Sequence, residues 1–160
     1  VFEQQAIGRE PHGLCGAAVC IAQGVVMSRQ ERFALALSHF EKALSRLKEV
    51  LAEPTETSIV RDSIIQRFEF TFESSWKAMY RWLRARGNDL DEEASATIPA
   101  AFARRLILAE KGWGDMRKFR NKTSHTYDEA LAIEVAAFVR HEAVPLFEAL
   151  LLTLKERGLE

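Results

Sequence analysis

The stretch RNKTSHTYDE, residues 120–129, contains an unusual number of side chains able to bind phosphate or move protons. The guanidinium of Arg120 presents a planar fork of N–H donors that matches the oxygens of a phosphate. His125 follows five residues later, and a neutral imidazole accepts a proton near pH 7. Arg120 and His125 are therefore candidates for an anion-binding and proton-transfer site.

Basic residues are concentrated around this stretch, although the whole chain carries a formal net charge of −1. Between residues 104 and 122, Glu110 and Asp115 are outnumbered by arginines and lysines. A nearly neutral chain does not attract nucleic acid through its overall charge, so any phosphate site must be local. The predicted phosphate-binding residues are Arg117, Lys118, Lys122, Thr123 and Ser124.

The same residues also have a purely structural interpretation. A basic run in a helical protein commonly forms a solvated face, and Arg120 is able to pair with Glu69 or Glu73, which lie one turn apart on a predicted helix. His125 is able to cap or pack a helix, and Tyr127 fits an amphipathic surface aromatic. The residues alone leave both interpretations open.

Long amphipathic helices are predicted to precede the stretch. Apolar residues recur at intervals of three and four from Phe33 to Leu51 and again from Ile64 to Leu83, as on the buried stripe of an α-helix. Pro54 is expected to end the first helix, and Gly87 with Asn88 to end the second. Two long helices joined by a short connection predict an antiparallel pair.

Shorter helices are predicted for the second half of the chain. After a loop over residues 88–97, Pro99 is expected to begin a helix that runs to about residue 111, because proline suits a first helical turn. Its expected core face is Phe102, Leu106 and Ile107. Gly112 and Gly114 are then expected to break the helical structure of the chain. A fourth segment is expected to start near residue 113 and to run to about residue 124.

The last helix is predicted to start near Thr126 and to continue to the C-terminal end, with a kink at Pro145. Thr126 and Glu129 match a capping box, and Asp128 is a competing cap. The expected apolar side of this helix is Ile133, Ala137, Phe138, Leu146, Leu150 and Leu154. Its N–H groups and dipole would favour a phosphate and would help to keep His125 neutral. The expected fold is an all-α, antiparallel four-helix bundle of four to five helices.

Composition and cysteine content limit the class of protein. Cys15 and Cys20 both precede the helical region, so no disulfide can link the main body, which fits a cytoplasmic location. No apolar run approaches the ~20 residues that span a bilayer. No metal site is predicted, because C-x4-C alone lacks two ligands and no E-x-x-H motif occurs.

Residues 1–27 differ from the rest of the chain, since glycine is frequent and helical periodicity is absent. They are predicted to be a non-native or loosely ordered tail, with residues 28–160 as the helical bundle. In one interpretation Met27 is the natural start. A secretory leader is a second interpretation, but the segment has no starting methionine and no basic cluster. A native, loosely packed tail is the third.

Two motifs carry a resemblance to a known family. RDSIIQRFEFTFESSWKAM (residues 61–79) and RNKTSHTYDEALA (residues 120–132) resemble the nucleotidyltransferase substrate-binding proteins of the HEPN superfamily. Arg120, His125 and Tyr127 fit the R-x4-H-x-Y pattern. The first motif matches through Asp62, Gln66, Phe68, Glu69, Glu73, Trp76 and Lys77. The resemblance extends from about Arg32 to the C-terminal end.

The resemblance implies a HEPN-like homodimer whose partner is a minimal nucleotidyltransferase encoded nearby, which would bind the nucleotide triphosphate and Mg. This chain would help to form the substrate site, with Glu69, Glu73 and Trp76 in support. In many HEPN ribonucleases an Arg–His pair cleaves RNA without a metal. By analogy, His125 would activate a 2′-hydroxyl, Arg120 would stabilise the charged phosphorane, and Asn121 would orient the pair. In some systems the partner modifies the motif tyrosine with AMP, and Tyr127 is the matching position here. Relatives often carry an arginine after the proline of the third helix, whereas Ala100 follows Pro99 here.

Three functional interpretations follow. The first is a non-catalytic accessory subunit that presents substrate to a nucleotidyltransferase. The second is a ribonuclease toxin of a toxin–antitoxin pair, neutralised by the same partner. The third is a helical scaffold in which Arg120 and His125 only brace the bundle. Near-zero net charge disfavours a dedicated RNA-binding protein, and the local basic patch favours one, so the sequence does not choose between them.

Overall fold

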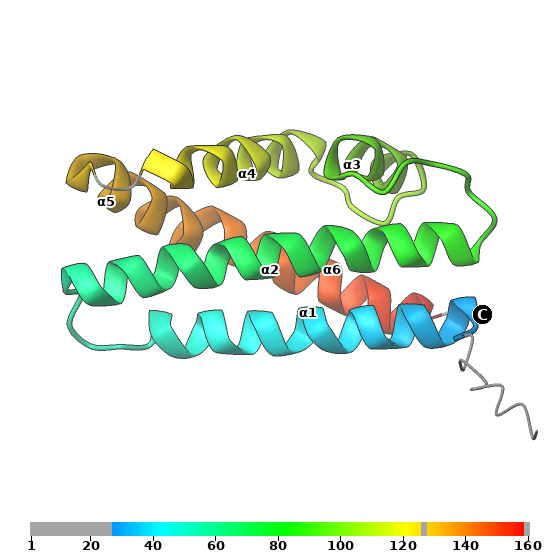
Figure 1. The fold of residues 1–160 in the computed structure, drawn as a ribbon, viewed down its shortest axis with the longest axis horizontal. Helices are drawn as coiled ribbons and strands as arrows, with labels where there is room; N and C mark the ends of the chain where they lie inside the picture. Colours follow the sequence, from blue (N-terminus) through cyan, green and yellow to red (C-terminus); the bar gives the residue numbers. More distant parts are fainter. Residues whose placement is uncertain (1–26, 126–127, 159–160) are drawn as a thin grey trace, which may run out of the picture.

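The computed structural model describes residues 27–125 and 128–158, except for the side chain of His125. The predicted tail, apart from Met27, lies outside these residues. Helix α1 (Arg29–Leu51) and helix α2 (Ser58–Ala85) form a long antiparallel hairpin (Figure 1). Ser28 begins α1 with a capping box, in which its hydroxyl accepts from the Glu31 N–H and its own N–H donates to Glu31. The hydrogen bond from the Ser28 backbone N–H to the carboxylate is the main cause that holds the pKa of Glu31 below its usual value.

Shorter helices complete the bundle around α2. Helices α3 (Ala94–Ala103) and α4 (Glu110–Lys122) lie on the side of α2 away from α1, and a 3-10 turn (Thr123–His125) follows α4 (Figure 1). Helix α5 (Glu129–Phe138), a π-helical turn (Val139–Ala143) and helix α6 (Val144–Arg157) form one continuous run.

Counted with that run as one unit, the described residues form five helices, and all their regular structure is helical. The predicted all-α fold of four to five helices is therefore confirmed. The irregularity expected at Pro145 occurs just before it, as the π turn. A π turn lets a helix continue when a proline removes one of its hydrogen bonds.

The predicted bounds of the third helix are wrong. Helix α3 begins five residues before Pro99, within the stretch expected to be a loop, and it ends at Ala103. Pro99 therefore lies inside a short helix, where it removes one hydrogen bond without ending the helix. Leu106 and Ile107 are buried as predicted, but in the connection to α4, and Phe102 is 40% exposed.

The prediction that Gly112 and Gly114 break the chain is also wrong, because both lie within α4. A Cβ atom at Gly112 would lie 2.8 Å from Cδ1 of Leu146 on α6. Glycine at this position allows α4 to approach α6 closely. Glycine disfavours helices, so the sequence alone predicts a break here. It does not reveal that Leu146 packs against this position.

The core is built from aromatic side chains contributed by several helices. The ring centroid of Phe147 lies 6.0 Å from that of Phe40, 6.3 Å from that of Phe68 and 5.8 Å from that of Trp113. All four side chains are buried. Helix α2 contacts every other α-helix, so it forms the central support of the bundle. Ile133 is 48% exposed and Ala137 is exposed, so their predicted place in the core is wrong.

Candidate functional site

Helix α4 brings three of the predicted site residues to one pocket. Arg117, Arg120 and Asn121 are spaced at i, i+3 and i+4, so their side chains share one face of the helix. We call this pocket the Arg120 pocket. It has a volume of about 380 Å³ and is lined by Phe72, Glu73, Trp76, Glu92, Glu93, Ala94, Ser95, Arg117, Arg120 and Asn121. It therefore lies where α2, α4 and the start of α3 meet.

Arg120 is anchored by a carboxylate of α2. Its Nε atom lies 3.4 Å from Oε1 of Glu73, which is close enough for an ion pair. The N–H does not meet hydrogen-bond geometry, and the buried Nε has no hydrogen-bond partner among the described residues. The structural interpretation in which Arg120 pairs with Glu73 is thus confirmed. The Arg120 side chain is nevertheless 40% exposed and lines the pocket, so it is accessible to a ligand.

Glu73 is held in place by a second contact. The indole Nε1 of Trp76 donates a hydrogen bond to Oε2 of Glu73 at 3.1 Å. One oxygen of Glu73 therefore faces Arg120 while the other is occupied by a neighbour one turn away on the same helix. This arrangement fixes the carboxylate and, through it, the direction of the Arg120 side chain.

The pocket carries charges of both signs. Besides Glu73, Glu92 and Glu93 line it from the segment that leads into α3. Oε1 of Glu92 accepts a hydrogen bond from Arg81 at 2.7 Å, and Oε2 of Glu93 accepts one from Ser95 at 2.9 Å. A pocket with two guanidinium groups and three carboxylates suits a small ligand that has both acceptors and donors better than it suits a long polyanion.

Glu92 and Glu93 were missed by the sequence reasoning, because they lie in a stretch expected to be a loop. Their acidic run is visible in the sequence, as LDEE at residues 90–93. An exposed loop rich in Asp and Glu normally indicates solvated surface. The periodicity does not reveal that this segment folds back over α2.

Thr123 and Glu69 form a polar contact between α4 and α2. The Thr123 hydroxyl lies within hydrogen-bonding distance of Oε1 of Glu69 and 2.6 Å from the backbone oxygen of Arg120. Thr123 is 5% exposed. Ser124 is exposed, and its hydroxyl donates to the backbone oxygen of Asn121 at 3.3 Å. Both hydroxyls predicted to bind phosphate therefore contact the protein itself.

Two predicted phosphate-binding lysines do not line the pocket. Nζ of Lys118 lies 3.0 Å from Oδ1 of Asp115, and this hydrogen bond lowers the pKa of Asp115. Nζ of Lys122 lies 5.1 Å from the ring centroid of Phe119, a cation–π contact. Both lysines are exposed. They add positive charge near the site without converging on it.

The start of α5 differs from the predicted one. Asp128 is the N-cap, and its Oδ1 accepts hydrogen bonds from the N–H groups of Ala130 and Leu131, at 2.9 and 3.4 Å. The helix therefore starts after Asp128, the competing cap, and the predicted start near Thr126 is wrong. Because a carboxylate already occupies these amides, they are not an open anion site.

His125 is separated from that helix start by two residues. Its backbone ends the 3-10 turn after α4, and Thr126 and Tyr127 lie outside the described residues. The prediction that the α5 dipole keeps His125 neutral relied on direct adjacency to the helix and is not supported. The roles predicted for His125 and Tyr127 in chemistry stay predictions.

The described residues contain no group of three or more His, Cys, Asp or Glu side chains placed to hold a metal ion. Among the same residues, no helix has both the length and the apolar character that a bilayer crossing requires.

Comparisons with known proteins agree with the family resemblance. Residues 35–156 match the family described as "Nucleotidyltransferase substrate binding protein like". A solved crystal structure from Thermus thermophilus is 33% identical, with a TM-score of 0.66 over 72% of this chain and 98% of that one. The probable ribonuclease HepT of Haemophilus influenzae is 36% identical over 90 residues, which cover 51% of this chain and 62% of that protein.

The family match covers α2 to α5 in full and most of α1 and α6, and it includes all the residues that line the Arg120 pocket. The helical fold, the two motifs and the match over most of the chain point to the same assignment. The chain belongs to the nucleotidyltransferase substrate binding protein-like family.

Proposed function

We propose that this chain is an accessory subunit that binds substrate for a minimal nucleotidyltransferase, and that the Arg120 pocket holds part of that substrate. Family membership supports the general role. The observation that carries the proposal is the convergence of Arg117, Arg120 and Asn121 with three carboxylates in one pocket of about 380 Å³. Guanidinium groups there would bind phosphate or carboxylate groups, and the carboxylates would accept hydrogen bonds from hydroxyl or ammonium groups.

In this proposal the chemistry of nucleotide transfer belongs to the partner. The nucleotidyltransferase, encoded near this gene, would bind the nucleotide triphosphate and Mg. This chain would act as a homodimer that orients the acceptor substrate. Arg120, held by Glu73, would fix the position of an acidic group on that substrate.

A ribonuclease is the second candidate, favoured by the similarity to a protein named probable ribonuclease HepT. His125 would remove the proton of an RNA 2′-hydroxyl, and the 2′-oxygen would attack the adjacent phosphorus. The 5′-oxygen of the next nucleotide would then leave and take up a proton. Arg120 would stabilise the phosphorane, and Asn121 would orient the pair. RNA would then be the substrate and the nucleotidyltransferase the neutralising partner.

Co-purification and an RNA-cleavage assay separate the two candidates. The full chain is expressed with and without the nucleotidyltransferase encoded beside its gene, and labelled RNA is added to each preparation. An accessory subunit is expected to co-purify with that enzyme and to leave the RNA intact in both states. Cleavage by the chain alone, stopped by the partner and lost in Arg120→Ala and His125→Ala, would overturn the accessory role and support the ribonuclease.

Tyr127 gives a further test of the partnership. If the partner modifies this hydroxyl, incubation of the two proteins with ATP and Mg should raise the mass of this chain by one or more AMP units. The increase should be absent in Tyr127→Phe. An unchanged mass in the wild-type chain, with an active partner, would remove Tyr127 as an acceptor.

A further inference from the structure

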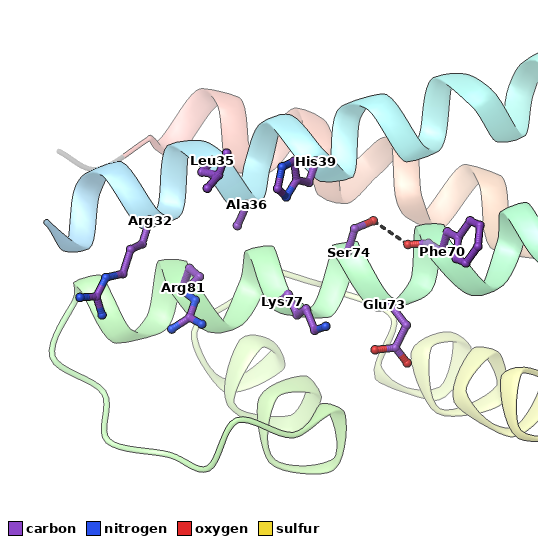
Figure 2. A pocket seen from close by; sticks show the side chains of 9 residues that line it. All are labelled: Arg32, Leu35, Ala36, His39, Phe70, Glu73, Ser74, Lys77 and Arg81. Atoms are coloured by element: carbon purple, nitrogen blue, oxygen red, sulfur yellow. Dashed lines mark hydrogen bonds between the residues drawn. The ribbon is translucent and has the colours of Figure 1, made fainter. Parts of the chain in front are cut away.

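A second concave surface runs along the other side of α2, between α1 and α2. Pockets of about 620, 230 and 210 Å³ lie along this helix pair. The largest shares His39 and Phe70 with the second, and Arg32 and Arg81 with the third, so the three form one continuous groove. We call it the α1–α2 groove. Figure 2 shows its central part, with Arg32 and Arg81 at one end and Phe70 at the other.

The spacing of residues along the two helices produces this groove. On α2, the lining positions 67, 70, 74, 77, 81 and 84 alternate steps of three and four, which keeps them on one stripe of the helix. On α1, positions 32, 36, 39, 43 and 46 do the same, and Ala36 and Ala43 leave room between the helices. At 1.5 Å per residue, the α2 stripe is about 25 Å long and the α1 stripe about 21 Å.

Most cations in the α1–α2 groove lack an acidic partner. Arg81 and Arg84 pair with Glu92 and Asp89. The remaining basic side chains make no ion pair among the described residues; they are Arg29, Arg32, Lys42, Arg46, Arg67 and Lys77. Glu73 is the acidic residue in the lining, and it already pairs with Arg120. The groove therefore concentrates positive charge on a chain whose net charge is −1.

An exposed aromatic ring lies where two of the pockets meet. Phe70 lines both the 620 and the 230 Å³ pockets, and it is 51% exposed although it belongs to the long central helix. His39, on α1, lines the same two pockets. A solvent-exposed phenylalanine within a row of cations offers a flat apolar face to a ligand whose other groups are anionic.

We propose that the α1–α2 groove binds single-stranded nucleic acid. Unpaired cations along a groove of about 25 Å can follow the phosphates of about four nucleotides, and an exposed ring can stack on an unpaired base. A duplex keeps its bases stacked inside and has no free base for Phe70. An acidic protein surface would pair with the cations but has no bases to stack on the exposed ring of Phe70. Charge and aromatic exposure together therefore favour a single strand.

Fluorescence anisotropy with labelled twelve-residue oligo(U) and oligo(dU) tests this proposal on the full chain. Single strands are expected to bind with a log K against log salt slope of about −3, since each engaged phosphate contributes about −0.7. Preference for one strand identifies the sugar that is recognised. A duplex of equal length should bind at least tenfold more weakly. Equal binding of the duplex, or equal competition by polyglutamate, would overturn the proposal.

Variants of the α1–α2 groove distinguish binding in the groove from non-specific electrostatic binding of the oligonucleotide elsewhere on the chain. Lys42→Gln with Arg46→Gln should weaken binding at least tenfold and make the slope shallower by about 1.4, the value of two phosphate contacts. Lys48→Gln with Lys155→Gln removes the same charge outside the groove, where each lysine pairs with a glutamate. That control should change affinity less than twofold. Similar losses in both pairs would contradict a defined groove.

Phe70 provides an independent check of base stacking. Phe70→Ala should weaken binding about tenfold, whereas Phe70→Tyr should keep the affinity within about threefold. Ile59→Ala, at another exposed apolar position, is the matched control and should have no effect. An unchanged affinity in Phe70→Ala would rule out stacking. Conversion of a dimer to a monomer by the groove variants, seen by light scattering, would instead assign this surface to a second copy.

The proposal does not depend on the function proposed for the Arg120 pocket, because the two linings share a single described residue, Glu73, and no cation. Arg120→Ala frees the charge of Glu73 in the groove lining, so it should weaken oligonucleotide binding, but less than the loss of Lys42 and Arg46 does. If Arg120→Ala abolishes binding and the groove variants do not, the strand lies at the pocket and the groove proposal fails. If partner binding fails while oligonucleotide binding depends on the groove, only the accessory role is lost.

Discussion

Arg120 combines a fixed position with an accessible charge. Its Nε faces Glu73 at 3.4 Å, while 40% of its side chain remains exposed. An exposed ion pair typically contributes ~0–1 kcal/mol, because solvent screens the charges and ordering two long side chains costs entropy. The pair therefore orients Arg120 without making the bundle depend on it.

Replacing Arg120 by alanine should consequently change stability little. We expect Arg120→Ala to lower the free energy of unfolding by less than about 1 kcal/mol in urea titrations. A loss of about 3 kcal/mol or more would mean that Arg120 braces the bundle, which would support the scaffold interpretation. Arg117→Ala, at an exposed position on the same helix, is the matched control.

Thr123 should behave differently from its neighbour Ser124. Thr123→Val removes a nearly buried hydroxyl that contacts Glu69, so we expect a loss of about 1–2 kcal/mol in unfolding free energy. Ser124→Ala removes an exposed hydroxyl and should change stability by less than about 0.5 kcal/mol. Urea titration of both variants measures this difference. Equal effects would contradict a structural role for the Thr123–Glu69 contact.

The sequence predicts part of the lining of the Arg120 pocket. Arg117, Arg120 and Asn121 were predicted because residue type and helical spacing are visible in the chain, and Glu73 was foreseen as a partner of Arg120. Glu93 was not foreseen, because its place beside α2 depends on the path of a connecting segment. Long-range contacts of this kind leave no local periodic signal.

At the scale of the elements, the junction between α4 and α5 determines how far the residues of the R-x4-H motif lie from the helix ends. Helix α4 ends at Lys122, and the carboxylate of Asp128 closes the first turn of α5. Thr126 and Asp128 are both good caps, so sequence alone could not choose between two starts that differ by two residues. The structure moves the helix start away from His125, and Arg120 is the residue of the motif whose side chain it describes.

Replacing the cap tests this start. We expect Asp128→Ala to cost about 1 kcal/mol in unfolding free energy, and Asp128→Asn to cost a few tenths, because asparagine also caps well. Thr126→Ala should cost less than Asp128→Ala. The reverse order in urea titrations would restore Thr126 as the cap and the helix start beside His125.

Helix existence was predicted more reliably than helix bounds. The stripes of α1 and α2 are long and regular, so their burial follows directly from the spacing of apolar residues. The ends of α3 and the glycines of α4 were mispredicted because proline and glycine occur inside helices as well as at their ends. At Gly112 the deciding fact is a close approach to Leu146, which is 34 residues away along the chain.

At the scale of the whole molecule, α2 separates two surfaces of different character. The Arg120 pocket on one side is small and mixed in charge, and the α1–α2 groove on the other is longer and mainly basic. Both depend on a rigid α2, which is held by an aromatic core. Damage to this core should therefore affect both surfaces together.

Phe147 tests the importance of that core. Phe147→Ala should lower the free energy of unfolding by about 3–5 kcal/mol, since it removes a buried ring that packs against Phe40, Phe68 and Trp113. Leu152→Ala, at a position that is 58% exposed, should cost less than about 1 kcal/mol. Urea titrations measure both values. Similar small losses would contradict the described core.

Nucleotide transfer by the purified complex tests the central claim, that the Arg120 pocket presents substrate to a partner nucleotidyltransferase. The complex with the enzyme encoded beside this gene is given radiolabelled ATP, Mg and the small-molecule fraction of a cell extract. We predict transfer with the wild-type chain and at least a tenfold loss with Arg120→Ala, while the complex stays assembled. Equal transfer by the two complexes would contradict the account.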